Sequence, residues 1–362
     1  MTPEDSAARA GGAPSRARSG HAPWAFVGAL ALTLAFVLAL ALGPSRVALA
    51  DVGRALLSIA GVDSPSLSES ARLVVVTVRL PRALLALGVG ATLATAGAAV
   101  QGLFRNPLAE PGLVGVSAGG SLGAALAIVV GAPVFAIAPA WLRPAILPLA
   151  AFAGSFAVTE IVLRVGTVAG KASALVMILA GVAVNAFAGA LIGAAAYWAS
   201  DRQLRDLVFW MLGSLASSNE RTLFTALPPM LVATLALLTF GRRLNLLALG
   251  DMDARRLGVR IERDKRRVVV LIALGVGASV AAAGLIGFVG LVVPHLVRLA
   301  RGPDHRALLP LSALLGATLV LACDTIARTV VAPLELPLGA LTALAGAPVF
   351  LALLLRARRS LA

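Results

Sequence analysis

Long apolar runs alternate with short basic segments along almost the whole of this chain. A membrane-spanning helix needs about 20 mainly apolar residues, because the hydrocarbon core is about 30 Å thick and a helix rises about 1.5 Å per residue. The runs that meet this requirement are 24–43, 83–104, 113–132, 145–165, 172–198, 223–240, 307–326 and 337–355. The pattern therefore predicts an all-α, polytopic membrane protein.

The run 268–297 is too long for one ordinary span and short for two. Cytoplasmic loops carry an excess of Arg and Lys, so the charges that follow decide how this run crosses. A break into two short passages around Gly284, Gly287 and Gly290 returns the later arginine clusters to the cytoplasm. We therefore predict ten spans with both termini cytoplasmic, which places 21 of the 31 basic residues inside and 10 outside.

Composition supports a membrane protein. Hydrophobic residues make up 59% of the chain and charged residues 13%, whereas soluble domains are about 45–50% apolar and about 25% charged. The net charge of +14 is not interpreted as a sign of nucleic-acid binding, because the arginines lie between apolar runs. At these positions, attraction to anionic lipid headgroups and the positive-inside rule account for them. We expect a multi-pass membrane protein. Cys323, the single cysteine, should pack as a small hydrophobe.

Residues 1–23 are rich in Ala, Gly, Ser and Arg and are predicted to form a disordered cytoplasmic tail. Residues 24–362 then form one membrane domain. The sequence 48–50, Ala-Leu-Ala, resembles a signal-peptidase site. The apolar stretch before it is about 20 residues long, however, and signal peptides have about 7–15. We therefore expect this stretch to remain as the first membrane helix.

The segment LGVGATLATAG at 87–97 is echoed by LGVGASVAAAG at 274–284, with 8 of 11 positions identical. The two copies fall on spans predicted to cross in opposite directions, which indicates an inverted repeat of the kind found in transporters. A shared small-residue composition is the alternative explanation. Glycines at helical spacing are expected to let helices pack closely; they are Gly115, Gly119, Gly123, Gly181, Gly189 and Gly193.

Three motifs suggest chemistry that their surroundings do not support. Ser117 lies in a G-x-S-x-G pattern, with His295 on another span, but a hydrolase needs a strand-to-helix elbow and Ser117 opens an apolar helix. The segment 166–171 resembles a phosphate loop, but only three residues separate its glycines, and Ala172 stands where Ser or Thr should bind magnesium. Three histidines form no metal cluster. We predict no catalytic residue, bound cofactor or metal site.

Polar residues inside the spans are pathway candidates, because burying them in a membrane is costly. Glu160 and Asn185 are the ones we single out, although Asn185 can equally bond to a neighbouring helix. Asp324 and Arg328 are four residues apart and can pair on one helix. A proton-coupled secondary carrier, the alternative from another functional class, would need more midplane acids or histidines than these.

The loop 241–267 holds 9 of the 31 basic residues and an amphipathic stretch. Its apolar face is expected to consist of Leu246, Leu247, Leu249 and Leu257. A short amphipathic helix of this kind fits the groove of a partner protein. The loop is therefore a candidate docking element.

Several longer motifs follow one another in order from residue 79 to the C-terminus. They are RLPR at 79–82, GLFRNPLAEPGLVGVSAGG at 102–120, FWMLGSL at 209–215, LGDMDARRLGV at 249–259, GLIGFVGLVVPHLVRLARGPDHRALLP at 284–310, CDTIAR at 323–328 and ELPLGALTALAGAPVFLALLL at 335–355. In these motifs the chain resembles the FecCD-type permease family, the transmembrane subunits of ATP-binding-cassette (ABC) importers for iron siderophores, haem and cobalamin.

The resemblance implies a type II importer permease fold with ten helices in a bacterial cytoplasmic (inner) membrane, and no enzymatic activity of its own. It implies a second permease, either another copy or a homologous chain, with which this one encloses a central pathway. Two cytoplasmic ATPase subunits would use ATP and magnesium, and an extracytoplasmic binding protein would deliver the substrate. We expect a ferric siderophore, with haem or cobalamin as the alternatives.

The resemblance also assigns roles to individual residues. The segment 245–262 would form the coupling helices that dock on the ATPase, through Leu249, Gly250, Asp251, Ala254, Arg255, Leu257 and Gly258. Binding-protein docking would fall to Arg79, Arg82 and Arg328, which the predicted topology places outside. A cytoplasmic gate is expected at Asn106, Pro107 and Leu108. Residues 206–217 would form a short helix at the mouth of the pathway.

Overall fold

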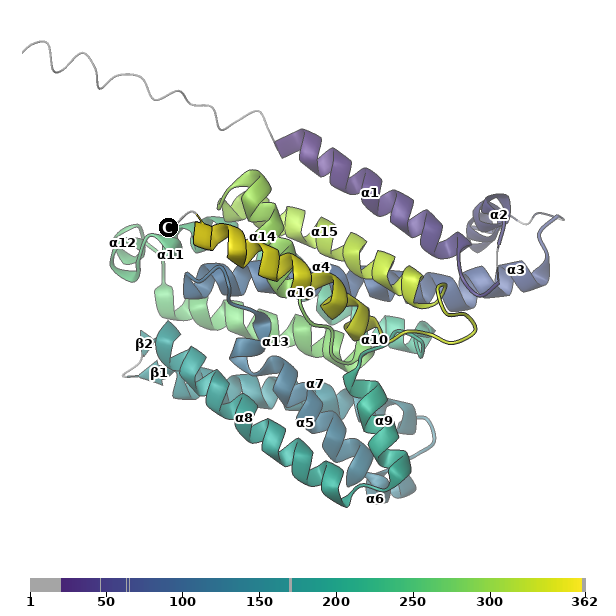
Figure 1. Cartoon of the computed structure of the whole chain (residues 1–362), viewed down its shortest axis with the longest axis horizontal. Coiled ribbons are helices and arrows are strands. Elements are labelled where there is room, and N and C mark those ends of the chain that lie inside the picture. The colour runs from purple at the N-terminus through teal and green to yellow at the C-terminus, as the bar shows by residue number, and fades with distance from the viewer. Residues whose placement is uncertain (1–20, 46, 63, 65, 169–170, 360–362) are drawn as a thin grey trace, which may run out of the picture.

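Helices run back and forth between two ends of the molecule in a computed structural model that describes residues 21–45, 47–62, 64, 66–168 and 171–359 (Figure 1). In chain order the elements are α1 (His21–Ala41), α2 (Leu49–Ile59), α3 (Glu69–Leu73), the π-helical η2 (Val74–Arg79), α4 (Leu80–Phe104), the 3₁₀-helical η3 (Pro111–Val114), α5 (Val116–Val129), α6 (Ala132–Ile137), α7 (Arg143–Val165), β1 (Thr167–Val168), β2 (Lys171–Ala172), α8 (Ala174–Trp198), α9 (Asp201–Met211), α10 (Glu220–Leu238), α11 (Gly241–Ala248), α12 (Asp251–Arg256), α13 (Ile261–Ala283), α14 (Val289–Arg301), α15 (His305–Ala327) and α16 (Leu338–Arg359). The strands β1 and β2 pair antiparallel.

Each of the ten predicted spans coincides with a helix. Among the described residues, seven helices are long and apolar enough to cross a membrane: α1, the continuous helix 69–104, α7, α8, α10, α13 and α15. The remaining passages are α5 with 14 residues, α14 with 13 and α16. Successive passages reverse direction (Figure 1). The all-α, polytopic fold predicted from the sequence is therefore confirmed.

We call the end of the bundle that carries α11 and α12 the α12 end, and the opposite end, which carries α2 and α9, the α2 end (Figure 1). The start of α1 and the end of α16 both face the α12 end. The tail predicted for 1–23 lies outside the described residues up to position 20, and α1 already includes 21–23.

The core of the bundle is α4. In the most apolar part of the helix 69–104, 83% of the residues are buried, compared with 17% for α1 and 22% for α8. Glycines bring neighbouring backbones against it: a Cβ atom at Gly90 would lie 2.2 Å from the carbonyl oxygen of Gly316 on α15, and one at Gly97 would lie 1.8 Å from that of Gly290 on α14. Such close approach drives helix association in lipid.

The other predicted packing glycines behave in two ways. Gly119 and Gly123 meet backbone atoms of α7, and Gly181 meets the carbonyl of Leu113, so these three pack as expected. Gly189 and Gly193 have nothing within 4 Å of an added Cβ. The packing role predicted for this second pair is therefore wrong within this chain.

Replacing Gly97 with Ala should destabilise the protein by about 1–3 kcal/mol, because the added methyl meets backbone atoms that cannot change rotamer, and α4 and α14 must separate. The matched control is Gly53→Ala on α2, which adds the same methyl where nothing lies within 4 Å and also improves helix propensity. Thermal unfolding in detergent measures both. Equal losses of stability in the two variants would contradict this account of the α4–α14 contact.

The structure moves the start of the second span. This span was predicted at 83–104, but the helix begins at Glu69. The prediction treated Arg79 and Arg82 as loop residues, whereas both lie inside the helix with 3% and 7% of their surface exposed. Oxygen atoms of other segments accept their hydrogen bonds, which removes the cost of burying them.

The break predicted in 268–297 is confirmed: α13 ends at Ala283, Gly284 has φ +68°, and α14 begins at Val289. The prediction of two short passages is wrong for α13, which has 23 residues because it starts at Ile261 and includes a charged segment. Of these two passages, only α14, about 20 Å long, is shorter than the hydrocarbon core. The short helix predicted at 206–217 is α9, which starts earlier, at Asp201.

The repeat copies lie on α4 and α13, which run antiparallel, as their predicted opposite crossing requires (Figure 1). They also touch, since a Cβ at Gly275 would lie 2.6 Å from Cγ2 of Thr92. Cys323 on α15 is 7% exposed and packs in the hydrophobic core, as predicted.

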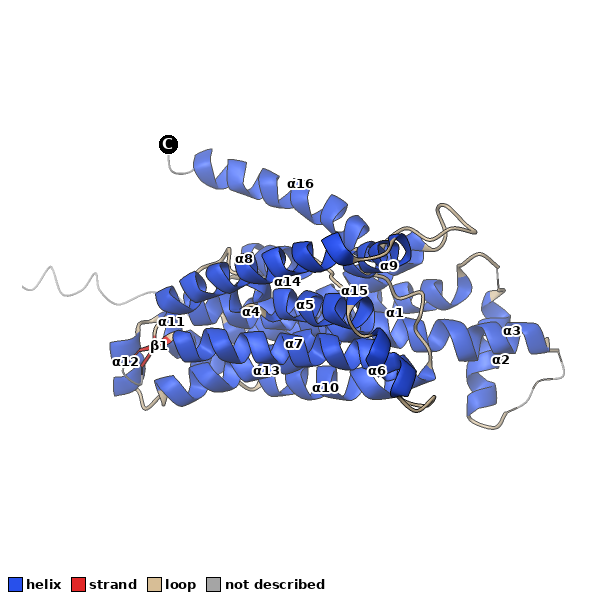
Figure 2. Cartoon of the chain, turned by 90° about the horizontal axis from the view of Figure 1, so that it is seen from below, coloured by secondary structure: helices blue, strands red, loops and turns tan. Residues whose placement is uncertain are grey.

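Two features have no counterpart in the predictions. The helices α2 and α3 project beyond the bundle at the α2 end (Figures 1 and 2), and α3 is capped by Ser68, whose hydroxyl accepts a hydrogen bond from the amide of Ala71. At the other side of the molecule, α16 leans away from the remaining helices (Figure 2).

Candidate functional site

Residues 249–258, which we call the apex, project at the α12 end. Gly250 (φ +119°) and Gly258 (φ +85°) bound α12 in backbone conformations that favour glycine. Ala254 is fully buried and holds α12 down, while Leu249, Met252 and Leu257 are 62%, 72% and 59% exposed. The apex therefore presents three large apolar side chains outward.

This apolar face differs from the predicted one. Leu249 and Leu257 were expected on it and are exposed, but Leu247 is buried and Leu246 packs against the core. Met252 takes their place. The predicted face combined leucines from both sides of Gly250, whereas the turn at Gly250 separates α11 from α12.

Asp251, the first residue of α12, connects the apex to the bundle. Its carboxylate accepts a hydrogen bond from Nζ of Lys265 at 2.7 Å and another from Nη2 of Arg105. Arg105 caps the end of α4 and also donates to the carbonyl of Leu247 at 2.7 Å. Lys265, on α13, donates to the carbonyl of Ala172 at 3.0 Å. We call Arg105, Asp251 and Lys265 the anchor; it joins α12 to α4, α13 and β2.

Sequence reasoning missed two of the three anchor residues. Lys265 is 4% exposed. It is one of only two lysines among the 31 basic residues, and that rarity was the available signal. A buried ammonium can hold two acceptors where a guanidinium would need more room. Arg105 carried a weaker signal, because it lies inside the matching motif at 102–120.

The apex should stay ordered from pH 5 to 8 and loosen below about pH 4. Burial alone would raise the pKa of Asp251, but Lys265 and Arg105 outweigh it and hold the pKa below its usual range. A carboxyl group with a lowered folded-state pKa stabilises above its unfolded-state pKa, and that stability is lost as pH falls through the folded-state value.

Hydrogen exchange of the amides at 249–258, followed by mass spectrometry, tests this. Asp251→Asn should exchange faster than the unchanged chain at pH 7 and should lose the acid transition. If the variant exchanged like the unchanged chain at pH 7, the anchor would not be what orders the apex.

The predicted gate segment adjoins the anchor directly. Oδ1 of Asn106 accepts a hydrogen bond from the amide of Leu108 at 2.9 Å, and the amide of Asn106 donates to the carbonyl of Gln101 at 3.1 Å. Asn106 and Pro107 thus form a tight turn directly after Arg105. The gate role stays a prediction; Arg105 connects this turn to the apex through its bonds to Leu247 and Asp251.

The two pathway candidates have contacts inside the chain. Nδ2 of Asn185 donates to the carbonyl of Gly112 at 3.0 Å, which is the bond to a neighbouring element left open by the sequence. Glu160 accepts a hydrogen bond from Nε of Arg164 at 2.8 Å, and Nη2 of Arg266 lies 3.9 Å from it. Their pathway role stays a prediction.

The three arginines predicted to dock the binding protein come together toward the α2 end. Arg82 donates to both carboxylate oxygens of Asp324, at 2.9–3.1 Å, and to those of Glu335 at 2.8 and 2.9 Å. Nε of Arg328 lies 3.8 Å from Asp324. The pairing predicted for Arg328 and Asp324 is therefore present, but Arg82 is the closer partner.

Arg79 and Arg328 also hold the end of α1. Arg79 donates to the carbonyls of Leu40 and Ala41, at 2.6 and 2.8 Å, and Arg328 donates to that of Ala39. The last carbonyls of a helix lack partners within it and carry partial negative charge, so two guanidinium groups suit this position.

This arrangement changes what the arginines can offer a partner. Arg79, Arg82 and Arg328 are 3%, 7% and 4% exposed, and each is bonded within the chain. The most accessible carboxylate of the cluster is Glu335, whose side chain is 30% exposed. The docking role stays a prediction, and the structure places the three side chains beneath the surface.

The motifs set aside in the sequence remain without a catalytic setting. Ser117 lies in the first turn of α5 directly after η3, so the helix is not preceded by the strand that a nucleophile elbow needs. In the part of the chain that the structure describes, no group of three or more His, Cys, Asp or Glu side chains is placed to hold a metal ion.

Comparison with known proteins agrees with this architecture. The chain is 43% identical to the hemin transport system permease protein HmuU of Yersinia pestis over 329 residues, which are 91% of this chain and 96% of that protein. It is 44% identical to the vitamin B12 import system permease protein BtuC of Escherichia coli O157:H7 over 294 residues, 81% of this chain and 86% of the relative.

A solved structure described as an inward-facing conformation of an ABC transporter of the metal-chelate type superposes with a TM-score of 0.77 and 33% identity. The superposed region covers 92% of this chain and 98% of the chain in that structure. The model of the FecCD transport family matches residues 31–356. The chain therefore belongs to the FecCD transport family and is a permease subunit of an ABC importer.

Proposed function

We propose that this permease carries a metal chelate across the cytoplasmic membrane, with haem as the first candidate. The observation that carries this proposal is the 43% identity to the hemin permease across 96% of that protein. A ferric siderophore, expected from the sequence, is the second candidate, because a structural neighbour is of the metal-chelate type. Cobalamin is the third, since relatives at 42% and 44% identity are named for it.

Two ATPase subunits, which bind ATP and magnesium, would drive transport by docking at the apex, through Leu249, Gly250, Asp251, Ala254, Arg255, Leu257 and Gly258. The exposed Leu249, Met252 and Leu257 support this, because apolar side chains on a short helix suit a groove on a partner. The anchor would pass movement of the ATPase to α4 and α13 as rigid bodies. The nine basic residues in 241–267 favour a cytoplasmic position for the α12 end.

A second permease, identical or homologous, would cover α8. Along this helix Leu175, Leu179, Val182 and Phe187 are 54–67% exposed, and Gly189 and Gly193 are open. A central pathway formed there would include Asn185 and be closed on the cytoplasmic side by the turn at Asn106–Leu108.

The binding protein would dock at the α2 end. Because Arg79, Arg82 and Arg328 are buried and bonded, their part would be to hold that surface in shape, while the partner contacts the exposed rim. Charge reversal at these positions would therefore lower stability together with docking, so a docking test needs a parallel measurement of unfolding.

Reconstitution tests the proposed function. The permease, its partner ATPase and the matching binding protein would be placed in proteoliposomes and offered labelled haem, a panel of ferric siderophores and cobalamin. We expect uptake of haem that requires all three components and hydrolysable ATP. An ATPase unable to hydrolyse ATP is the control.

The outcomes separate the candidates. Uptake of a siderophore alone would replace haem with the second candidate and keep the importer. Uptake that persists without the ATPase and follows a proton gradient would overturn the proposal in favour of a secondary carrier.

A further inference from the structure

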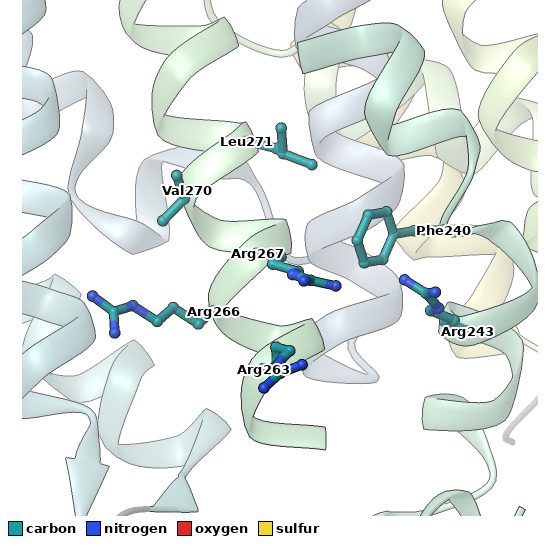
Figure 3. A pocket seen from close by; sticks show the side chains of 7 residues that line it. All are labelled: Phe240, Arg243, Arg263, Arg266, Arg267, Val270 and Leu271. Atoms are coloured by element: carbon teal, nitrogen blue, oxygen red, sulfur yellow. The ribbon is translucent and has the colours of Figure 1, made fainter. Parts of the chain in front are cut away.

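Four arginines surround a cavity of about 580 Å³ at the α12 end, between the end of α10 and the start of α13 (Figure 3). They are Arg243 from α11 and Arg263, Arg266 and Arg267 from α13. Phe240, Val270 and Leu271 complete the lining, so that one part of the cavity is basic and the other apolar. The functions proposed above make no use of this cavity.

The arginines are incompletely neutralised. Asp264 lies 3.5 Å from Nη1 of Arg243 and 3.9 Å from that of Arg267, so one carboxylate serves two guanidinium groups. Nη2 of Arg266 lies 3.9 Å from Glu160, which also pairs with Arg164. Among the described residues Arg263 pairs with no carboxylate within 4 Å. The cavity therefore keeps a positive charge that a ligand can neutralise.

One of these arginines is restrained beside the cavity, and their side chains are accessible to a ligand. The guanidinium of Arg243 lies 5.1 Å from the centre of the Phe240 ring, a cation–π distance that restrains it beside the cavity. The side chains of Arg243, Arg266 and Arg267 are 46%, 68% and 54% exposed. Planar guanidinium groups at this exposure can bind phosphate oxygens in pairs.

The position along the helix indicates where the ligand comes from. The apolar part of α13 begins directly after Arg267, with Val268 and Val269, so the arginines lie at the boundary between the span and its polar surroundings. On the neighbouring α10, Leu231, Val232 and Leu235 are 47–60% exposed. At this depth a phosphate is accompanied by acyl chains, which exposed apolar helix surface accommodates.

We propose that this cavity binds the phosphate headgroup of an anionic phospholipid, with the arginines on the phosphate and Val270 and Leu271 beside the start of the acyl chains. The match of charge and the boundary position favour lipid over a soluble anion. The site lies next to the apex: Lys265 of the anchor directly precedes the cavity residue Arg266 on α13. A bound lipid would therefore brace the helix to which the anchor is attached.

Native mass spectrometry of the detergent-solubilised permease tests the proposal with cardiolipin, phosphatidylglycerol and phosphatidylcholine as probes. The cavity variant is Arg263→Gln with Arg267→Gln. The control variant, Arg242→Gln with Arg306→Gln, removes the same charge from two exposed arginines at the same end that do not line the cavity. We expect the cavity variant to retain roughly tenfold less anionic lipid, with the control within about twofold of the unchanged chain.

A second variant guards against a folding defect. Arg263→Lys with Arg267→Lys keeps the charge and should keep most of the lipid, at an unchanged melting temperature. Equal retention of anionic lipid by the cavity and control variants would overturn the proposal. So would binding of inorganic phosphate as tightly as lipid, which would indicate a soluble anion, or unchanged lipid retention with a loss of ATPase affinity, which would indicate a protein interface.

Discussion

Replacing Leu257 with Asp should abolish ATP-driven uptake and leave the folded permease intact. Leu257 is 59% exposed, so a carboxylate at this position stays hydrated in the isolated permease and costs little. On docking, the same carboxylate would enter an apolar groove without a partner, which is costly. We expect the affinity for the ATPase to fall by roughly thirtyfold, the change that about 2 kcal/mol at an interface produces.

Uptake and ATPase binding would be measured with the permease in nanodiscs and proteoliposomes. The matched control is Leu257→Met, which keeps an apolar side chain of similar volume and should preserve both activities. If Leu257→Asp transported at the same rate as Leu257→Met, the apex would not be the docking element, although the fold and the family would stand.

Asp324→Asn should lower the free energy of unfolding by about 3 kcal/mol or more. The side chain of Asp324 is 1% exposed and lies between Arg82 and Arg328, whose side chains are 8% and 4% exposed. Removing its charge leaves two buried guanidinium groups with Glu335 as the remaining carboxylate of the cluster. Breaking one half of a buried ion pair costs more than the pair itself contributes, because the remaining charge is left in a low dielectric.

A double variant separates the cost of leaving a buried charge unpaired from the contribution of the ion pair itself. Arg82→Met with Asp324→Leu replaces both partners by apolar groups and should be closer to the unchanged chain than Asp324→Asn is. Glu335→Gln, at a side chain that is 30% exposed, should cost less than half as much. Thermal unfolding in detergent would report all three. A melting temperature for Asp324→Asn within error of the unchanged chain would show that the cluster is not structural.

Most spans could be predicted because lipid imposes a length requirement that eight of the apolar runs meet locally, while 268–297 needed the charge pattern as well. The limits of this reasoning appear where polar residues enter helices. The start of α13 could not be predicted, because the apolar run begins only at Val268 while the helix begins at Ile261. The charged side chains of Asp264 and Lys265 are buried in this first part of α13, where groups of α11, α12 and β2 pair with them.

In the candidate site too, local features could be predicted and contacts between distant residues could not. The segment proposed to dock on the ATPase could be singled out from a local motif, although only Leu249 and Leu257 of its four predicted apolar residues are exposed. Its anchor could not, because Arg105 and Asp251 are 146 positions apart. Arg82 and Glu335 are 253 positions apart, so the sequence offered no reason to pair them. Without that pairing, three arginines near the predicted outer surface looked available to a partner, whereas the folded chain uses them itself.

The burial of Cys323 has a practical consequence. Its thiol is 7% exposed, and the chain contains no other cysteine, so thiol-directed probes should leave the unaltered permease almost unlabelled. A cysteine introduced at Met252, which is 72% exposed, would then carry a spin label or fluorophore without removal of the native residue. The movement of the apex during a transport cycle thus becomes measurable by spectroscopy in an otherwise unmodified chain.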